Sequence, residues 1–182
     1  MTYWIVKSGV CMNEICRVAG YVKLAKLWER SSETARAYHR SHYTNKYAQD
    51  ARYQLVDVYI DITGQKKIRN RPEMLRLIHD CMRGEIDCIA AQTRGYLAAN
   101  MQEFCYLIKF LFDLNRNIQI MTEDVEFHIN TAVNQDHQRE ALIQMANSYI
   151  KLKPADYALW RSDIEKAIYG ETSKSLKDGT RT

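Results

Sequence analysis

Three charged residues occupy positions at which a parallel α/β fold could use them for chemistry. Asp61 directly follows the apolar, β-branched run 56–60, and Arg94 follows a second such run at 86–91. Arg71 stands where a helix is predicted to begin. The carboxyl ends of parallel strands share one sheet edge, and ligands bind at that edge. A carboxylate with two guanidinium groups there would suit a phosphate or another anion.

The elements that must position these residues follow from the hydrophobic pattern. Short β-branched runs alternate with amphipathic helical stripes, which predicts an α/β fold with a mostly parallel central sheet of four or five strands flanked by helices. Pro72 is suited to open the helix after Arg71, and Gly84 to end it. Residues 15–22 also fit helical spacing, so a helix there remains an alternative. The predicted strands are residues 20–24, 55–60, 86–91 and 118–122, and the predicted helices are residues 33–52, 72–83 and 101–114.

The stretch 59–100 resembles the catalytic domain of serine recombinases, the resolvase/invertase family. That family has a strand ending in Asp, a Ser-Gly loop, an Arg-Pro helix start, a Gly-x-Ile-Asp turn and a strand ending in Ser-Arg or Asp-Arg. The likeness extends from about Val18 to about Val133. It implies a resolvase-like fold, followed by a long helical segment, and attack of a serine hydroxyl on a DNA phosphodiester. The matching residues here are Asp61, Thr63-Gly64, Arg71-Pro72, Gly84-Glu85-Ile86-Asp87 and Thr93-Arg94.

The same resemblance shows which catalytic groups are missing. The family's first strand carries Tyr-x-Arg-x-Ser, and the matching stretch here runs from Tyr21 through Lys23 to Ala25. Ala25 therefore stands at the position of the nucleophile and has no hydroxyl. Lys23 keeps the charge of the family's arginine but not its bidentate fork. A second family arginine, one turn after Arg94, is Leu97 here. We therefore expect a recombination-associated pseudoenzyme of a mobile element that cannot cleave DNA.

Two other registers remain open. Residues 3–7 also form a short apolar run near a cation, and Ser8 after it could be the nucleophile of an active recombinase fragment. A register at Arg17-Val18-Ala19 keeps an arginine but again offers alanine. A third function, from a different class, is a flavodoxin-like interaction module that does not act on DNA.

The amino-acid composition limits which ligands and which cellular location are expected for this chain. The chain has 182 residues, 46% of them apolar, with a net charge of +4, which permits nucleic-acid binding without arguing for it. Five cysteines without a CxxC pair predict reduced thiols in a cytoplasmic protein. The histidines show no metal-binding spacing, and no glycine-rich phosphate loop occurs, so neither a metal nor a cofactor is expected. No apolar run reaches the length of a membrane span.

The chain divides into four predicted parts. Residues 1–17 form an arm, 18–133 the α/β domain, 134–169 a helical segment and 170–182 a flexible polar tail. In the family the helical segment carries subunit contacts, so we expect a homodimer or higher oligomer through residues 138–168. Tyr157 and Trp160 favour an interface there. No recognition module is evident after Ile168, so DNA binding by this chain alone is expected to be weak.

Overall fold

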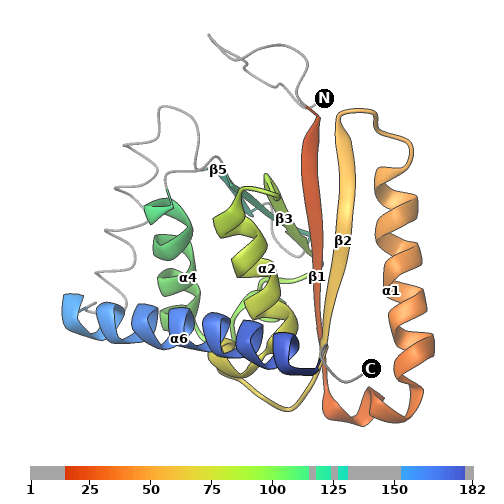
Figure 1. Cartoon of the computed structure of the whole chain (residues 1–182). Coiled ribbons are helices and arrows are strands. Elements are labelled where there is room, and N and C mark those ends of the chain that lie inside the picture. The colour runs from red at the N-terminus through yellow and green to blue at the C-terminus, as the bar shows by residue number, and fades with distance from the viewer. Residues whose placement is uncertain (1–14, 115–117, 124–126, 131–152, 179–182) are drawn as a thin grey trace, which may run out of the picture.

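A five-stranded sheet in the order β2-β1-β3-β4-β5 runs through the middle of the protein (Figure 1). The computed structural model describes residues 15–114, 118–123, 127–130 and 153–178. The first four strands are parallel and β5 is antiparallel to β4, which confirms the predicted α/β class and all four predicted strands. The strands are β1 (Cys16–Leu24), β2 (Tyr53–Ile62), β3 (Cys88–Ala91), β4 (Gln119–Thr122) and β5 (Phe127–Asn130).

Helices cover both faces of this sheet. Helix α1 lies on one face, while α2, α4 and α6 lie on the other (Figure 1). Among the described residues, no helix is long and apolar enough to cross a membrane. The helices are η1 (Lys26–Ser31), α1 (Ser32–Tyr47), η2 (Ile68–Asn70), α2 (Pro72–Arg83), α3 (Arg94–Leu97), α4 (Met101–Asp113) and α6 (Pro154–Asp178).

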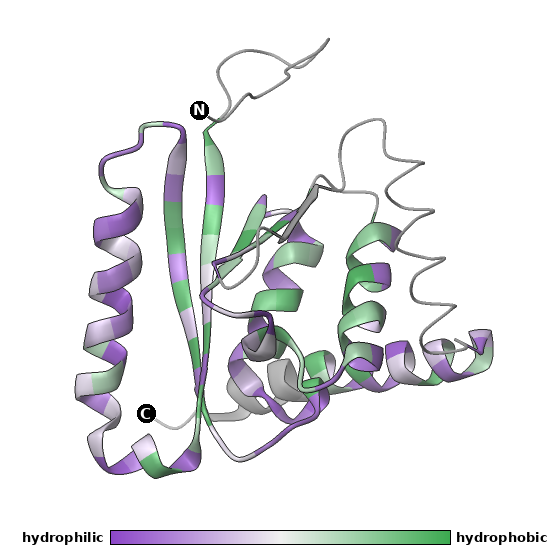
Figure 2. Ribbon diagram, turned by 180° about the vertical axis from the view of Figure 1, so that it is seen from behind, coloured by the Kyte–Doolittle hydropathy of each residue, from purple (hydrophilic) through white to green (hydrophobic). Residues whose placement is uncertain are grey.

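Alternation along β1 separates two hydrophobic cores. Successive strand side chains point to opposite faces, so Val18 and Val22 face α1 while Ala19 and Tyr21 face α2. Figure 2 shows α4 as mostly hydrophobic and α1 as more mixed, which fits their burial. The larger core, on the α2 side, therefore contains Tyr21, which is one of the predicted site residues.

The helix boundaries next to the site have local causes in the sequence. Pro72 occupies the first turn of α2, and Gly84 ends it in the left-handed region with φ 75°. The side chain of Asn100 accepts a hydrogen bond from Glu103 N and caps α4. These boundaries confirm the predicted start and end of α2.

Several predicted boundaries need correction. The helical alternative for residues 15–22 is wrong, because β1 pairs with both β2 and β3 from Cys16 onward. Helix α1 ends at Tyr47, and the hydrogen bond from Asp50 N to Tyr47 O closes a turn within the predicted helix 33–52. Helix α6 continues to Asp178, so the helical segment predicted at 134–169 extends into the stretch 170–182 predicted to be a flexible tail. Residues 134–152 of the predicted helical segment lie outside the described residues, as does the arm before Ile15.

Tyr157 and Trp160 of α6 pack against α4 of the same chain. Tyr157 is buried and its hydroxyl donates to Asp113 at the end of α4. Trp160 lies 5.6 Å from Tyr106 and 6.2 Å from Phe110, measured between ring centroids. These two residues therefore anchor α6 on α4, which corrects the expectation that they mark an interface.

An ion pair joins the beginnings of β1 and β3. The carboxylate of Asp87 accepts hydrogen bonds from the backbone N, Nε and Nη2 of Arg17 at 2.7–2.9 Å. Burial raises the pKa of Asp87, but the hydrogen bonds from Arg17 outweigh it, so the pKa lies below the usual value. Its contribution to stability is present above pH ~4 and is lost as the pH falls through the lowered pKa. This contact gives the Asp of the Gly-x-Ile-Asp turn a structural role.

Gly20 sets how closely α1 can approach β1. A Cβ at this position would lie 2.9 Å from the ring atoms Cγ and Cδ1 of buried Tyr43. We predict that Gly20→Ala lowers the free energy of unfolding by roughly 1–3 kcal/mol, because the ring cannot shift without disturbing the core. Urea denaturation would measure it. Gly64→Ala is the matched control, since nothing lies within 4 Å of an added Cβ there. Equal stability of the two variants would contradict this packing.

Candidate functional site

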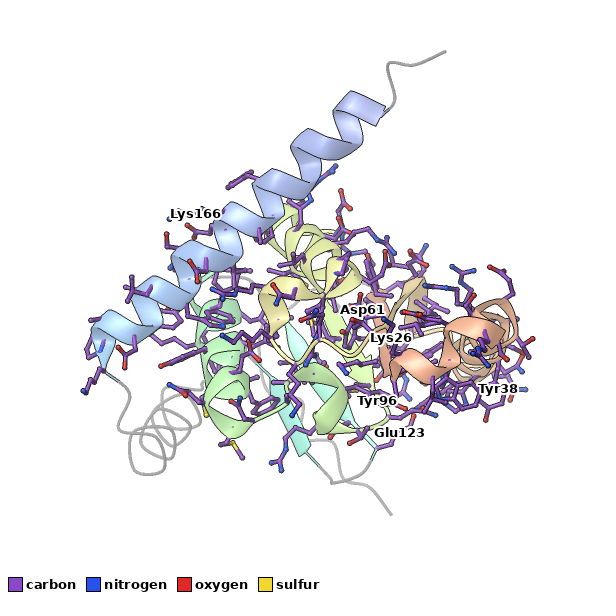
Figure 3. The ribbon with its side chains drawn as sticks, turned by 90° about the horizontal axis from the view of Figure 1, so that it is seen from below. Lys26, Tyr38, Asp61, Tyr96, Glu123 and Lys166 are labelled. Atoms are coloured by element: carbon purple, nitrogen blue, oxygen red, sulfur yellow. The ribbon has the colours of Figure 1, made fainter. Side chains whose placement is uncertain are left out.

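Strand pairing brings several of the predicted site residues together at the carboxyl edge of the sheet. In the parallel ladder of β1 and β2, the backbone position of Lys23 lies opposite that of Asp61. The Tyr21 hydroxyl donates to Asp61 Oδ2 at 2.9 Å. Figure 3 looks onto this edge and shows Asp61 in the middle of the view, with Lys26 and Tyr96 around it. The carboxylate predicted to do chemistry therefore lies inside the fold, and it is only 4% exposed.

Asp61 caps helix α2 from a neighbouring strand. Its Oδ1 accepts from Glu73 N at 3.1 Å and its Oδ2 from Met74 N at 2.9 Å. These amides are among the donors that a helix cannot satisfy internally, and a carboxylate also suits the positive end of the helix. Burial raises the pKa of Tyr21, and the negative charge of Asp61 adds to the rise, so the phenol stays neutral and donates. Asp61 thus uses both oxygens to position α2.

Arg71 is buried and linked to the backbone of two loops. Its exposed fraction is 0%, and its guanidinium donates to the carbonyls of Lys66, Tyr96 and Leu97. The Nε atom is buried without a hydrogen-bond partner among the described residues. These contacts join the loop after β2 to the turn after β3. Arg71 therefore lies close to Tyr21 and Asp61, but it has no surface that an external phosphate could reach.

The local field at this edge is positive. Desolvation lowers the pKa of Lys23, and the positive charges of Arg71 and Lys66 lower it further, against the opposing effect of Asp61. Lys23 Nζ donates to Thr63 O at 3.3 Å. Lys23 therefore lies near two other cations and near one carboxylate that is already hydrogen-bonded. An anion that approached Lys23 would relieve this repulsion.

The positions that the sequence register assigns to the family's nucleophile and second arginine hold apolar side chains. Ala25 directly follows β1, which lies between β2 and β3, and it is exposed. Leu97 is fully buried in the core beneath α2 and α4. Ala19, the alanine of the third register, is buried in the middle of β1 and does not reach this edge. Ser8 lies outside the described residues.

Arg94 contacts an aromatic ring of α4. It begins the short helix α3, and its guanidinium carbon is 5.8 Å from the centroid of the Phe104 ring on α4. A guanidinium over an aromatic face is attracted by the ring quadrupole. The backbone after Arg94 reaches the cluster, because Arg71 donates to the carbonyls of Tyr96 and Leu97.

Sequence reasoning missed one buried charge near this loop. Glu103 of α4 is 8% exposed, and its Oε1 accepts from Ile68 N at 2.8 Å. It appeared to be an ordinary acidic residue in the first turn of a helix, and only its place among apolar neighbours could have indicated burial. Glu103 and Arg71 together hold the loop 63–71, through Ile68 N and Lys66 O respectively. Within the described residues, no group of three or more His, Cys, Asp or Glu side chains could hold a metal ion.

A separate hollow of about 280 Å³ opens on the α1 side of the sheet. Its lining includes Lys46, Tyr47, Tyr53, Met121 and Glu123, and Lys46 pairs with Glu123 at its rim. None of the predicted site residues lines it. The hollow therefore does not contribute to the chemistry of the carboxyl edge.

We predict that Arg71→Lys lowers the free energy of unfolding by roughly 2–4 kcal/mol, because a single ammonium cannot replace the fork that holds buried carbonyls of two loops. Arg69→Lys is the matched control. Arg69 is 44% exposed and pairs with Asp163 at 2.5 Å, so its replacement should cost less than about 1 kcal/mol. Chemical denaturation of both variants checks this, and equal effects would show that Arg71 is not a structural clamp.

Comparison with known proteins agrees with this architecture. The fold is similar to that of the N-terminal catalytic domain of TP901-1 integrase, with a TM-score of 0.52 at 19% identity, covering 74% of this chain and 96% of that one. A resolvase family site-specific recombinase from Streptococcus pneumoniae gives a TM-score of 0.49 at 12% identity, covering 88% and 99% of the two chains.

The sequence itself gives a family. A comparison with curated protein sequences finds no match. The model of the family described as Resolvase, N terminal domain, matches residues 30–155. This match spans more than half of the chain and includes Asp61, Arg71 and Arg94. The chain therefore belongs to the resolvase N-terminal domain family.

Proposed function

We propose that this protein is a non-catalytic member of the resolvase family that acts with DNA in site-specific recombination, as a regulatory or partner subunit in the cytoplasm. The observation that carries the proposal is the residue after β1. Ala25 stands where the family places its nucleophile, and an alanine side chain cannot attack phosphorus. In a protease, loss of the nucleophile alone costs on the order of 10⁶ in rate.

The surrounding charges support the same proposal. Recombinase chemistry needs several guanidinium groups on the reacting phosphate. Here the guanidinium of Arg71 is buried and donates its hydrogen bonds to loop carbonyls, so a phosphate cannot reach it. Leu97 belongs to the hydrophobic core, and Lys23 offers an ammonium in place of a guanidinium. The retained Asp61 and Arg71 are explained by their roles in folding, so their presence does not require cleavage.

The two alternative functions, a flavodoxin-like interaction module and an active recombinase fragment, require different features of the chain. The family match argues against a flavodoxin-like module unrelated to resolvases. An active fragment would need Ser8 as its nucleophile, and this idea can be tested directly. Family membership supports a role with DNA, while the chain's modest net charge of +4 fits weak, sequence-indifferent binding.

We predict that the protein neither nicks supercoiled DNA nor forms a covalent protein–DNA adduct. The substrate should be a plasmid carrying the DNA that flanks its own gene, with an active serine recombinase on its own site as the positive control for trapping. Ala25→Ser should also be inactive, because Lys23 and Leu97 still leave the phosphate under-neutralised. Denaturing gels and peptide mapping would detect any phosphoserine link.

Ser8→Ala separates the two registers. An adduct formed by the unaltered protein and lost in Ser8→Ala would overturn the proposal and establish the active alternative. An adduct that appears only in Ala25→Ser would show that the phosphate site is still functional.

We also predict self-association through residues 138–168, as the family resemblance implies. Because Tyr157 and Trp160 pack on α4, the exposed Leu159 is a better candidate for the described part of that contact. Leu159→Glu should weaken dimerisation measured by light scattering, whereas Leu27→Glu on η1 should not. A protein that stays monomeric at all concentrations would contradict this prediction.

A further inference from the structure

The short helix η1 exposes a large aromatic residue beside the carboxyl edge of the sheet. Trp28 is 46% exposed and its neighbour Leu27 is 75% exposed, and η1 contains no buried residue. The helix begins directly after Ala25, and its first turn is closed by the hydrogen bond from Trp28 N to Ala25 O at 3.0 Å. Trp28 therefore lies three residues after the position that the sequence register assigns to the nucleophile, and the core does not account for its exposed indole.

Positive charge is concentrated on the same segment. Residues 26–46 contain five lysines and arginines and two glutamates, so they carry three of the chain's net four positive charges. Some of these cations serve the fold, since Arg36 donates to Ile60 O and Lys46 pairs with Glu123. Within the part of the chain that the structure describes, Lys26, Arg30 and Arg40 form no ion pair. An exposed indole thus lies among cations that have no protein partner there.

An exposed indole beside several cations favours a nucleic-acid ligand. Cations track a phosphate backbone, and an aromatic face binds a base by stacking with little preference for sequence. In an intact duplex the faces of the bases are occupied by their neighbours, whereas single-stranded DNA presents them. A protein interface would be expected to be poor in lysine and glutamate at its centre. Lys26 and Glu29 both flank Trp28 on η1.

We propose that η1 is a single-stranded DNA contact in which Trp28 stacks on an unpaired base while Lys26 and Arg30 contact the backbone. The proposal rests on the DNA-associated function proposed above and adds to it the strand state that the chain prefers. Tyr38 offers an internal comparison. It is 64% exposed, but it lies on the outer side of α1, away from Asp61 (Figure 3).

The test uses the full chain with Trp4→Phe, which leaves Trp28 and the core-packed Trp160 as the only tryptophans. Oligothymidine is titrated in low-salt buffer while tryptophan fluorescence and anisotropy are recorded, and a duplex of equal length serves as the competitor. We expect quenching of Trp28 and preference for the single strand. Trp28→Ala should weaken binding about 5- to 100-fold with an unchanged salt dependence. Trp28→Phe should restore part of the affinity.

Two matched variants complete the design. Lys26→Ala should lower the slope of log affinity against log salt by about 0.7, the value for one phosphate contact on a single strand. Tyr38→Ala should bind like the parent chain. Equal effects of Trp28→Ala and Tyr38→Ala would overturn the assignment of η1 as the contact.

The remaining outcomes separate this inference from the proposed function. If the chain binds DNA but Trp28→Ala binds as tightly and shows no loss of quenching, the inference is wrong and the DNA-associated function stands. The same holds if Trp28→Ala changes only self-association in light scattering, since η1 would then be a protein interface. If the chain binds neither single-stranded nor duplex DNA at low salt, both proposals fail.

Discussion

The carboxyl edge of the sheet depends on two buried charged side chains whose hydrogen bonds are all made to groups of the protein itself. Asp61 accepts two amide hydrogen bonds from the first turn of α2 and a third from the Tyr21 hydroxyl. Arg71 ties the loop after β2 to the turn after β3 through three carbonyls. Removing either group would leave buried partners unsatisfied, which is costly in a low-dielectric interior. The loop, the start of α2 and the α3 turn therefore form one unit.

This constraint gives Asp61 and Arg71 a structural role that does not depend on recombinase chemistry. In a site built for phosphoryl transfer, charges point toward the place where the reacting phosphate will lie. Here the carboxylate and the buried guanidinium point toward backbone groups, and a leucine fills the position of the family's second arginine. Groups that fold the protein would be needed whether or not the chain catalyses a reaction. Asp61, Arg71 and Asp87 can therefore match a family motif while Ala25 and Leu97 do not.

The sequence was informative where a local signal has one structural meaning. Pro72 and Gly84 bound α2 as predicted, and β-branched runs gave four parallel strands in the right places. It was less informative where burial decides the outcome. Nothing local distinguishes Arg71 at a helix start from an exposed, ligand-binding arginine, and Glu103 looks like any acidic first-turn residue. Likewise, Tyr157 and Trp160 suggested an interface until the packing of α6 on α4 was seen.

The central claim is that Arg71 is a structural clamp and not a phosphate ligand. The most direct measurement follows the side-chain Nε–H resonance of Arg71 by NMR in protein labelled with ¹⁵N at arginine, while inorganic phosphate is added. We expect a slowly exchanging signal that does not move, because the group is fully buried. A saturable shift of the Arg71 signal at millimolar phosphate would show that the guanidinium still binds the anion and would contradict the account.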